Sequence, residues 1–360
     1  MEIGNKIHIY RFISHLLHPN FVLDISNFRV NQYFWNRFVQ IGSSQLILPS
    51  IYCALKRKKL EKKVPVDLLL YLSKITKLNH QRNIDIIKQI DFLSKTFKVH
   101  QIEHVFLKGA AMLISQPQRF IIEERMIGDI DILVAEKDIQ KAQNILLNKG
   151  FEALPKKFSF TKGVFPNNKK KDIDRIVHSN YIAAVEIHID LLHINSDLIK
   201  AKEVLKNKVQ SISGKWIPSK NHLWQHAILN WQYNDNGISM NSLAFRTVAA
   251  VLYLEPNDVV DELITSNHAI KSFYSLLSLF YGNYKVYYPL KKIIYKLQLQ
   301  SNTFYSFYSI YLKTMSFIFI VFNRLFLFFI SKTYQKRVLN NPILFMTRVF
   351  KFWKNSSKNQ

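Results

Sequence analysis

The sequence predicts an α+β protein in which a small mixed sheet lies between two helical regions. Residues 1–100 and 196–302 carry apolar residues at the spacing of amphipathic helices. Between them, residues 101–195 have shorter apolar runs in which β-branched and polar residues alternate, which favours strands. Residues 303–360 form a basic, aromatic tail that we expect to be helical. With 360 residues, the chain is long enough for this four-part domain organisation.

Composition is typical of a globular protein in a reducing compartment. Hydrophobic residues make up 48% of the chain, which excludes a mostly disordered or collagen-like protein. The single cysteine, Cys53, excludes a disulfide framework and a cysteine-rich zinc site. Residues 1–21 lack the uninterrupted apolar segment of a secretory signal, so we expect a cytoplasmic location.

Positive charge is concentrated in the last part of the chain. The formal net charge is +25, from 50 Lys and Arg against 25 Asp and Glu. Residues 263–360 contain fourteen Lys or Arg and no acidic residue. This excess predicts an anionic partner. We rank an anionic membrane surface, contacted through residues 303–360, above nucleic acid, because no nucleic-acid recognition motif is present.

The most apolar segment of the tail, Met315–Ile330, is compatible with two structures. A membrane-spanning helix needs about 20 apolar residues, and this shorter segment has Arg324 near its centre. It could instead lie in the interface at the inner face of a membrane, flanked by Lys313 and Lys332. The alternative is a buried core helix of an all-helical C-terminal region.

The helical N-terminal region divides at residues that end or begin helices. Apolar residues at helical spacing cover residues 28–56, with interruptions near Gly42 and Pro49. A basic turn over residues 56–63 precedes a new helix that starts near Pro65. An apolar stripe in the last part of this region is expected in the core: Ile86, Ile90, Leu93 and Phe97.

The central region alternates strands with helices. The expected strands cover residues 104–107, 130–134, a segment starting at Phe151, 175–179 and 184–192. A tight turn at Gly109 leads into a short helix over residues 111–115, and a helix over residues 138–148 ends before Gly150. Residues 158–171 form a basic excursion. Beyond the core, Ser219 is expected to cap a helix.

Alternating carboxylates predict a metal site. Asp129 and Asp131 lie two residues apart in an expected strand, so both side chains point to one face. Glu186 and His188 repeat this spacing in a later strand. If the two strands are neighbours, Glu186 completes an acidic triad of the kind that holds divalent metal in phosphoryl transfer. His188 is expected either to contact the acceptor or a phosphate, or to be a hydrogen-bonded structural residue.

A glycine turn supplies a candidate phosphate site. Gly109 permits close backbone approach at the start of a helix, where backbone N–H groups favour phosphate. Lys108 and Arg125 are candidate phosphate contacts. Together and in this order, the glycine turn, the paired aspartates and the downstream glutamate are more specific evidence for a phosphoryl-transfer site than any one of them alone.

This order resembles the nucleotidyltransferase superfamily related to DNA polymerase beta. It is most similar to a branch of uncharacterised bacterial nucleotidyltransferase-like proteins. The matching segments are Leu107–Ala110, Arg125–Asp131, Gly150–Phe151 and Val185–His188. The resemblance covers about residues 100–195 and implies a minimal nucleotidyltransferase fold for the sheet core.

The resemblance also implies an activity, which is transfer of a nucleoside monophosphate from an NTP to an acceptor hydroxyl. It implies that Asp129 and Asp131 hold Mg²⁺ or Mn²⁺, and that Glu186 binds metal or activates the acceptor. The nucleotide-binding residues that it implies are Lys108, Gly109, Ala110, Arg125 and Gly128. The acceptor and the base of the NTP are left open.

One position departs from the superfamily pattern. The turn frequently contains Gly-Ser or Gly-Gly, whereas here Ala110 follows Gly109. Ala110 keeps its backbone N–H but lacks a hydroxyl for the triphosphate, and we expect Lys108 to compensate. Because of this departure, a non-catalytic NTP-binding protein is an alternative function. Because of the basic tail, a membrane-surface protein is another.

Overall fold

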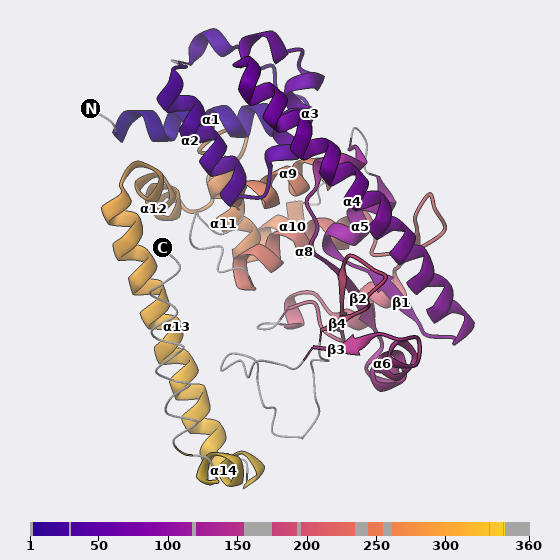
Figure 1. The fold of residues 1–360 in the computed structure, drawn as a ribbon. Helices are drawn as coiled ribbons and strands as arrows, with labels where there is room; N and C mark the ends of the chain where they lie inside the picture. The colour runs from indigo at the N-terminus through magenta and orange to yellow at the C-terminus, as the bar shows by residue number, and fades with distance from the viewer. Residues whose placement is uncertain are drawn as a thin grey trace.

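The α+β architecture is confirmed by a computed structural model (Figure 1). A five-stranded mixed sheet lies beside a larger body of helices drawn from both ends of the chain. The basic excursion expected at residues 158–171 and most of the chain after residue 340 lie outside the described residues. The structure describes residues 3–28, 30–116, 120–154, 175–192, 196–234, 244–254, 261–330, 332–340 and 342.

Four helices precede the sheet, and their boundaries follow local sequence signals. They are α1 (Ile3–Leu17), α2 (Gln32–Ser44), α3 (Leu48–Arg57) and α4 (Val66–Val99). The Asn31 side chain caps α2 by accepting a hydrogen bond from the Phe34 N–H. Pro49 lies in the first turn of α3, where its missing N–H costs nothing. The expected interruptions near Gly42 and Pro49 are therefore confirmed as helix ends.

The sheet has the order β1-β2-β5-β4-β3. Its strands are β1 (His104–Phe106), β2 (Asp129–Val134), β3 (Glu152–Ala153), β4 (Ile176–Val177) and β5 (Ala184–His188). β2 and β5 are parallel, and the other neighbours are antiparallel. Helix α5 (Lys108–Ser115) follows β1, and α6 (Ile139–Asn148) follows β2. A strand occurs at each expected place, but the expected strands at 175–179 and 184–192 are shorter.

The rest of the chain is mainly helical. After α7 (Ala201–Lys206), a hairpin of β6 (Val209–Gln210) and β7 (Trp216–Ile217) leads to α8 (Lys220–Tyr233). Ser219 caps α8, as expected, by accepting a hydrogen bond from the His222 N–H. The remaining helices are α9 (Ala244–Leu254), α10 (Asp261–Ser266), α11 (His268–Leu277), α12 (Pro289–Gln300), α13 (Asn302–Ile330) and α14 (Lys332–Leu339).

The N-terminal and C-terminal helices share one hydrophobic core. The ring of Tyr10 in α1 stacks on Phe245 in α9, with ring centroids 5.3 Å apart. The Tyr281 hydroxyl donates a hydrogen bond to the Ser14 carbonyl. The apolar stripe expected in the core, from Ile86 to Phe97, is fully buried in α4. The buried side chains form one continuous cluster from α1 to α12. The division into four domains remains a prediction.

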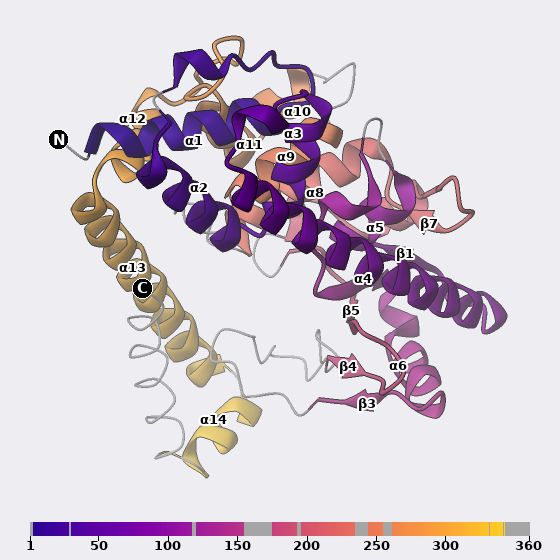
Figure 2. The same ribbon diagram turned by 45° about the horizontal axis from the view of Figure 1, so that its top comes forward.

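Helix α13 differs from all these elements because it extends away from the helical body (Figures 1 and 2). It contacts α12 at one end and α14 at the other. Among its residues with described side chains, none is buried, which does not fit the alternative of a buried core helix. Within the described part of the chain, no helix is long and apolar enough to cross a membrane.

Candidate active site

The register of β2 and β5 brings the predicted carboxylates together. Asp131 lies directly opposite Glu186 across this parallel pair, and Asp129 lies opposite Ala184. The side chains of Ile130 and Ile132, between and after the two aspartates, are fully buried. The alternation of apolar and acidic residues thus anchors β2 in the core while it presents the carboxylates on the other face.

His188 joins the two carboxylates in a compact cluster. Its Nε2 lies 2.8 Å from Asp131 Oδ1 and 3.9 Å from Glu186 Oε2. One ligand atom from each of Asp131, Glu186 and His188 lies within 4.8 Å of the others, so these three residues could hold a metal ion. Asp129, the other predicted ligand, lies at the solvent edge of the site with a side chain 38% exposed.

Two basic side chains neutralise much of the acidic charge. Lys108 Nζ donates a 2.8 Å hydrogen bond to Asp131 Oδ1, the same oxygen that His188 approaches. The Arg175 guanidinium lies 3.8 Å from Asp129 Oδ2 and 3.8 Å from Glu186 Oε1. The site therefore balances three carboxylates with two permanent cations and leaves a residual negative charge that favours a metal ion.

The pKa shifts at the site follow from this arrangement. Burial alone would raise the pKa of Asp131, but Lys108 and the hydrogen-bonded His188 hold it well below the ordinary value. Burial would likewise lower the pKa of Lys108, but the Asp131 carboxylate outweighs burial and raises it. The pKa of Asp129 is raised by burial and by the negative charges of Asp131 and Glu186. Asp131 is thus ionised and ready to bind a cation.

Arg175 is the site residue that sequence reasoning missed. It directly precedes β4, and the pairing of Ile176 with Val185 places it beside Glu186 on the neighbouring strand. The expected strand at residues 175–179 contained the signal. If this strand pairs with the strand that carries Glu186, an arginine at its start lies within reach of the Glu186 carboxylate.

Lys108 and Gly109, expected to form a tight turn before a helix over residues 111–115, lie instead in the first turn of α5, which is attached directly to the acidic strand. The Leu107 N–H donates a hydrogen bond to the Asp131 carbonyl, and Lys108 adopts a φ of 50°, in the left-handed region that is unusual for a residue with a side chain. A Cβ on Gly109 would lie 2.9 Å from the side chain of Ile127, so a larger residue there would require Ile127 to shift. Ala110 is buried behind the turn.

Arg125 and Gly128 have different surroundings. Arg125 Nη1 donates a long hydrogen bond to the Arg246 carbonyl in α9, and its Nε lies 3.6 Å from the Cβ position of Gly109. Its predicted phosphate contact stays a prediction. At Gly128, a Cβ would meet no atom within 4 Å, so the backbone before Asp129 is open to a ligand.

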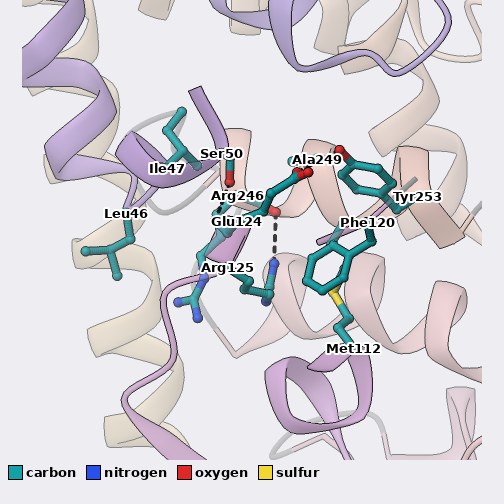
Figure 3. A pocket seen from close by; sticks show the side chains of 11 residues that line it. Leu46, Ile47, Ser50, Met112, Phe120, Glu124, Arg125, Arg246, Ala249 and Tyr253 are labelled. Atoms are coloured by element: carbon teal, nitrogen blue, oxygen red, sulfur yellow. Dashed lines mark hydrogen bonds between the residues drawn. The ribbon is translucent and has the colours of Figure 1, made fainter. Parts of the chain in front are cut away.

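Behind the loop that leads to β2 lies a small cavity of about 10 Å³, the space of a single water (Figure 3). Arg125 and Arg246 line it together with Glu124 and Tyr253. Glu124 accepts hydrogen bonds from the Tyr253 hydroxyl and from Arg57. Burial raises the pKa of Glu124 to about 7. These hydrogen bonds hold the start of the loop that leads to β2 between α3 and α9.

Helix α4 holds the same loop through buried amides. Asn79 Nδ2 donates hydrogen bonds to the carbonyls of Glu123 and Arg125, and Asn83 Nδ2 donates to those of Ile122 and Arg125. Both asparagines are almost fully buried. They satisfy the carbonyls of a non-helical segment that would otherwise lie unpaired in the interior.

One further amide of α4 holds the strand that carries Glu186. Gln89 donates to the Ala183 carbonyl at 2.8 Å and accepts from the Ala183 N–H at 3.1 Å, just before β5. Arg82 donates to the Ile127 carbonyl just before β2. The approaches to both acidic strands are therefore fixed by one helix. Sequence reasoning missed these residues, since an isolated Asn or Gln in a helical pattern resembles a surface residue.

The fold and the site together define a nucleotidyltransferase-like protein with a candidate metal centre on two parallel strands. The model of a family described as uncharacterised nucleotidyltransferase matches residues 32–231, more than half of the chain. The protein belongs to this family. No curated protein matches the chain. The matched range begins in α2 and ends in α8, so it includes α4 as well as the sheet.

Proposed function

We propose that the protein is a metal-dependent nucleotidyltransferase that transfers a nucleoside monophosphate from an NTP to a hydroxyl-bearing acceptor. The observation that carries the proposal is the placement of Asp131 opposite Glu186 on parallel strands, beside the turn at Lys108 and Gly109. Family membership supports the same class of reaction. A cytoplasmic location, where NTPs are abundant, is part of the proposal.

Asp131 and Glu186 are the proposed metal ligands, with His188 as a third ligand and Asp129 as a flanking carboxylate. Asp131, Glu186 and His188 fit such an ion, because one ligand atom from each already lies within 4.8 Å of the others. Carboxylate oxygens suit Mg²⁺, whereas an imidazole ligand favours Mn²⁺ over Mg²⁺. When bound, the cation supplies positive charge that orients the triphosphate and stabilises the charge developing during transfer.

Lys108 and Arg175 are proposed to bind phosphate oxygens during catalysis. In the structure both pair with carboxylates of the site. A divalent cation at these carboxylates would replace their charge partners and free both side chains for the triphosphate. The N–H groups at the start of α5, next to Gly109, add donors for the same phosphates.

The proposed reaction is an in-line displacement. The acceptor oxygen forms a bond to the α-phosphorus, the bond from this phosphorus to the bridging oxygen of the β-phosphate breaks, and pyrophosphate leaves. A carboxylate of the site receives the proton of the acceptor hydroxyl. The residues named above position the triphosphate for this attack and neutralise its charge.

Pyrophosphate release tests the proposal. Each NTP is incubated with the protein, Mg²⁺ or Mn²⁺ and a pool of small hydroxyl-bearing metabolites, and the Asp129→Asn and Asp131→Asn variants serve as controls. We expect release by the wild type and a loss of at least about 100-fold in Asp131→Asn. Equal turnover in wild type and both variants would contradict the assignment.

A non-catalytic NTP-binding protein is the second candidate. Ala110 removes a hydroxyl from the turn, and Lys108 is committed to Asp131 in the structure. Calorimetry separates the two candidates. Tight, metal-dependent binding of an NTP without pyrophosphate release would favour the binding protein, whereas binding with release favours the enzyme.

A further inference from the structure

Helix α13 carries an apolar stripe that the described protein leaves uncovered. The exposed side chains of the stripe recur every three, four or seven residues, so they lie along one face of the helix. Between Phe307 and Phe329 the stripe extends roughly 33 Å, at 1.5 Å per residue. We call this face the α13 stripe, and its residues are Phe307, Tyr311, Ile318, Phe322, Leu325 and Phe329.

Exposed phenylalanine side chains distinguish α13 from the rest of the described molecule. Among the described residues, every exposed phenylalanine lies in α13, and two of them, Phe322 and Phe329, are 67% and 75% exposed. The neighbouring helix α12 adds Leu290 and Ile293, exposed one helical turn apart. A contiguous exposed apolar surface on a folded protein is typical of an interaction site.

The charge around the α13 stripe identifies the kind of partner. Exposed lysines lie at both of its ends, Lys291 and Lys296 in α12 and Lys332 and Lys336 in α14. Residues 263–360 contain fourteen basic and no acidic residues, so a second copy of this region would offer no opposite charge. An anionic phospholipid surface offers both an apolar layer and a negative headgroup layer.

We propose that α13 lies in the interface of an anionic phospholipid membrane. The α13 stripe enters the boundary between headgroups and acyl chains, and the lysines of α12 and α14 contact the headgroup phosphates. This inference goes beyond the proposed enzymatic function and does not depend on it, since no residue of the sheet takes part.

Sedimentation with vesicles tests the inference on the full-length protein. The vesicles contain phosphatidylcholine alone or a mixture with phosphatidylglycerol, and binding is measured at low and high salt. We expect the wild type to bind the anionic vesicles about tenfold or more tightly than the neutral ones, with weaker binding at high salt.

The decisive variant is Phe322→Glu/Phe329→Glu, which places two negative charges in the α13 stripe. Its matched control is Leu70→Glu/Leu78→Glu, which makes the same change at two exposed positions of α4, 67% and 63% exposed. We expect the α13 variant to lose at least about tenfold in binding to anionic vesicles and the α4 control to lose much less.

Three outcomes would overturn the inference. The first is equal binding of wild type and the α13 variant, and the second is equal binding to neutral and anionic vesicles. The third is the absence of vesicle binding together with self-association of the wild type that the α13 variant abolishes, which would identify a second copy as the partner. Pyrophosphate release in solution is recorded for the same proteins, so failure of the proposed reaction is seen separately.

Discussion

The two longest helices in the described part of the chain, α4 and α13, differ in which side chains they bury and which they expose. α4 buries Asn83 and Gln89 and exposes mainly polar residues around them, whereas α13 exposes Phe322 and Phe329. The buried amides are stable because each meets backbone groups of the loops before β2 and β5. The exposed phenylalanines have no such compensation within the described structure, so they indicate a partner outside it.

This difference indicates that the two helices have separate roles. α4 is a framework element, since it fixes the approaches to the strands that carry Asp131 and Glu186. α13 touches the body through α12 and takes no part in the sheet. We therefore expect changes in the α4 framework to alter stability and the site together, and changes in α13 to leave both unchanged.

The largest expected effect on stability concerns Glu124, whose loop is held by α4. The raised pKa, about 7 against an ordinary 4.5, means that the folded state keeps a proton that the unfolded state releases. Stability should therefore fall as the pH rises from about 4.5 to about 7, by on the order of 3 kcal/mol. Glu124→Gln should flatten this dependence in urea unfolding, whereas the exposed control Glu203→Gln should retain it.

Asn83→Ala is expected to lower the free energy of unfolding by about 2 kcal/mol. The variant leaves the buried carbonyls of Ile122 and Arg125 without their amide donor. Urea unfolding measures the loss, and metal binding should weaken in parallel because the loop before β2 loses its support. Unchanged stability would show that α4 does not act as the framework of the site.

Asp129→Asn should have a smaller and opposite effect on the metal-free protein. The raised pKa of Asp129 shows that burial and its acidic neighbours disfavour its charged form. Removing the charge should stabilise the fold at neutral pH by about 0.5 kcal/mol, a small value because the side chain is partly exposed. The gain should vanish at acid pH, where the carboxyl is protonated, and a loss of stability at neutral pH would contradict this account.

The smallest effect is expected in α13. Phe322→Glu/Phe329→Glu should change the free energy of unfolding by less than about 0.5 kcal/mol, because both side chains are exposed. Thermal unfolding without vesicles measures it. A loss comparable to that of Asn83→Ala would mean that the α13 stripe is covered within the folded protein.

The sequence predicted part of the acidic cluster, because alternation along a strand fixes which side chains share a face; it proposed Asp129 as a metal ligand with Asp131 and Glu186, whereas the structure groups His188 with those two residues. It placed Asp131, Glu186 and His188 on common faces, and the parallel register then brought them together. The sequence could not reveal the position of Asn83, and it indicated Arg175 only through the expected strand at residues 175–179. Their roles depend on which segments are neighbours in space, and an isolated polar residue carries no periodic signal for that.

The fold also has one part that could be predicted from the sequence and one part that could not. The end of α2 at Ser44, close to Gly42, and the start of α3 at Leu48, next to Pro49, follow from local backbone chemistry and were predictable. Whether residues 315–330 are buried or exposed could not be predicted, because an apolar helix has the same sequence pattern in both cases. The structure answers that question by leaving every described side chain of α13 outside the core.

The central claim is that Asp131, Glu186 and His188 form a metal-binding site. Paramagnetic resonance of Mn²⁺ added to the full-length protein tests it most directly, with Asp131→Asn and Glu186→Gln as site variants and Phe322→Glu/Phe329→Glu as the control. Circular dichroism first confirms that each variant is folded. We predict Mn²⁺ binding with nitrogen coupling from an imidazole in the wild type and the control, and at least about tenfold weaker binding in both site variants. Equal Mn²⁺ binding in all four proteins would contradict the claim.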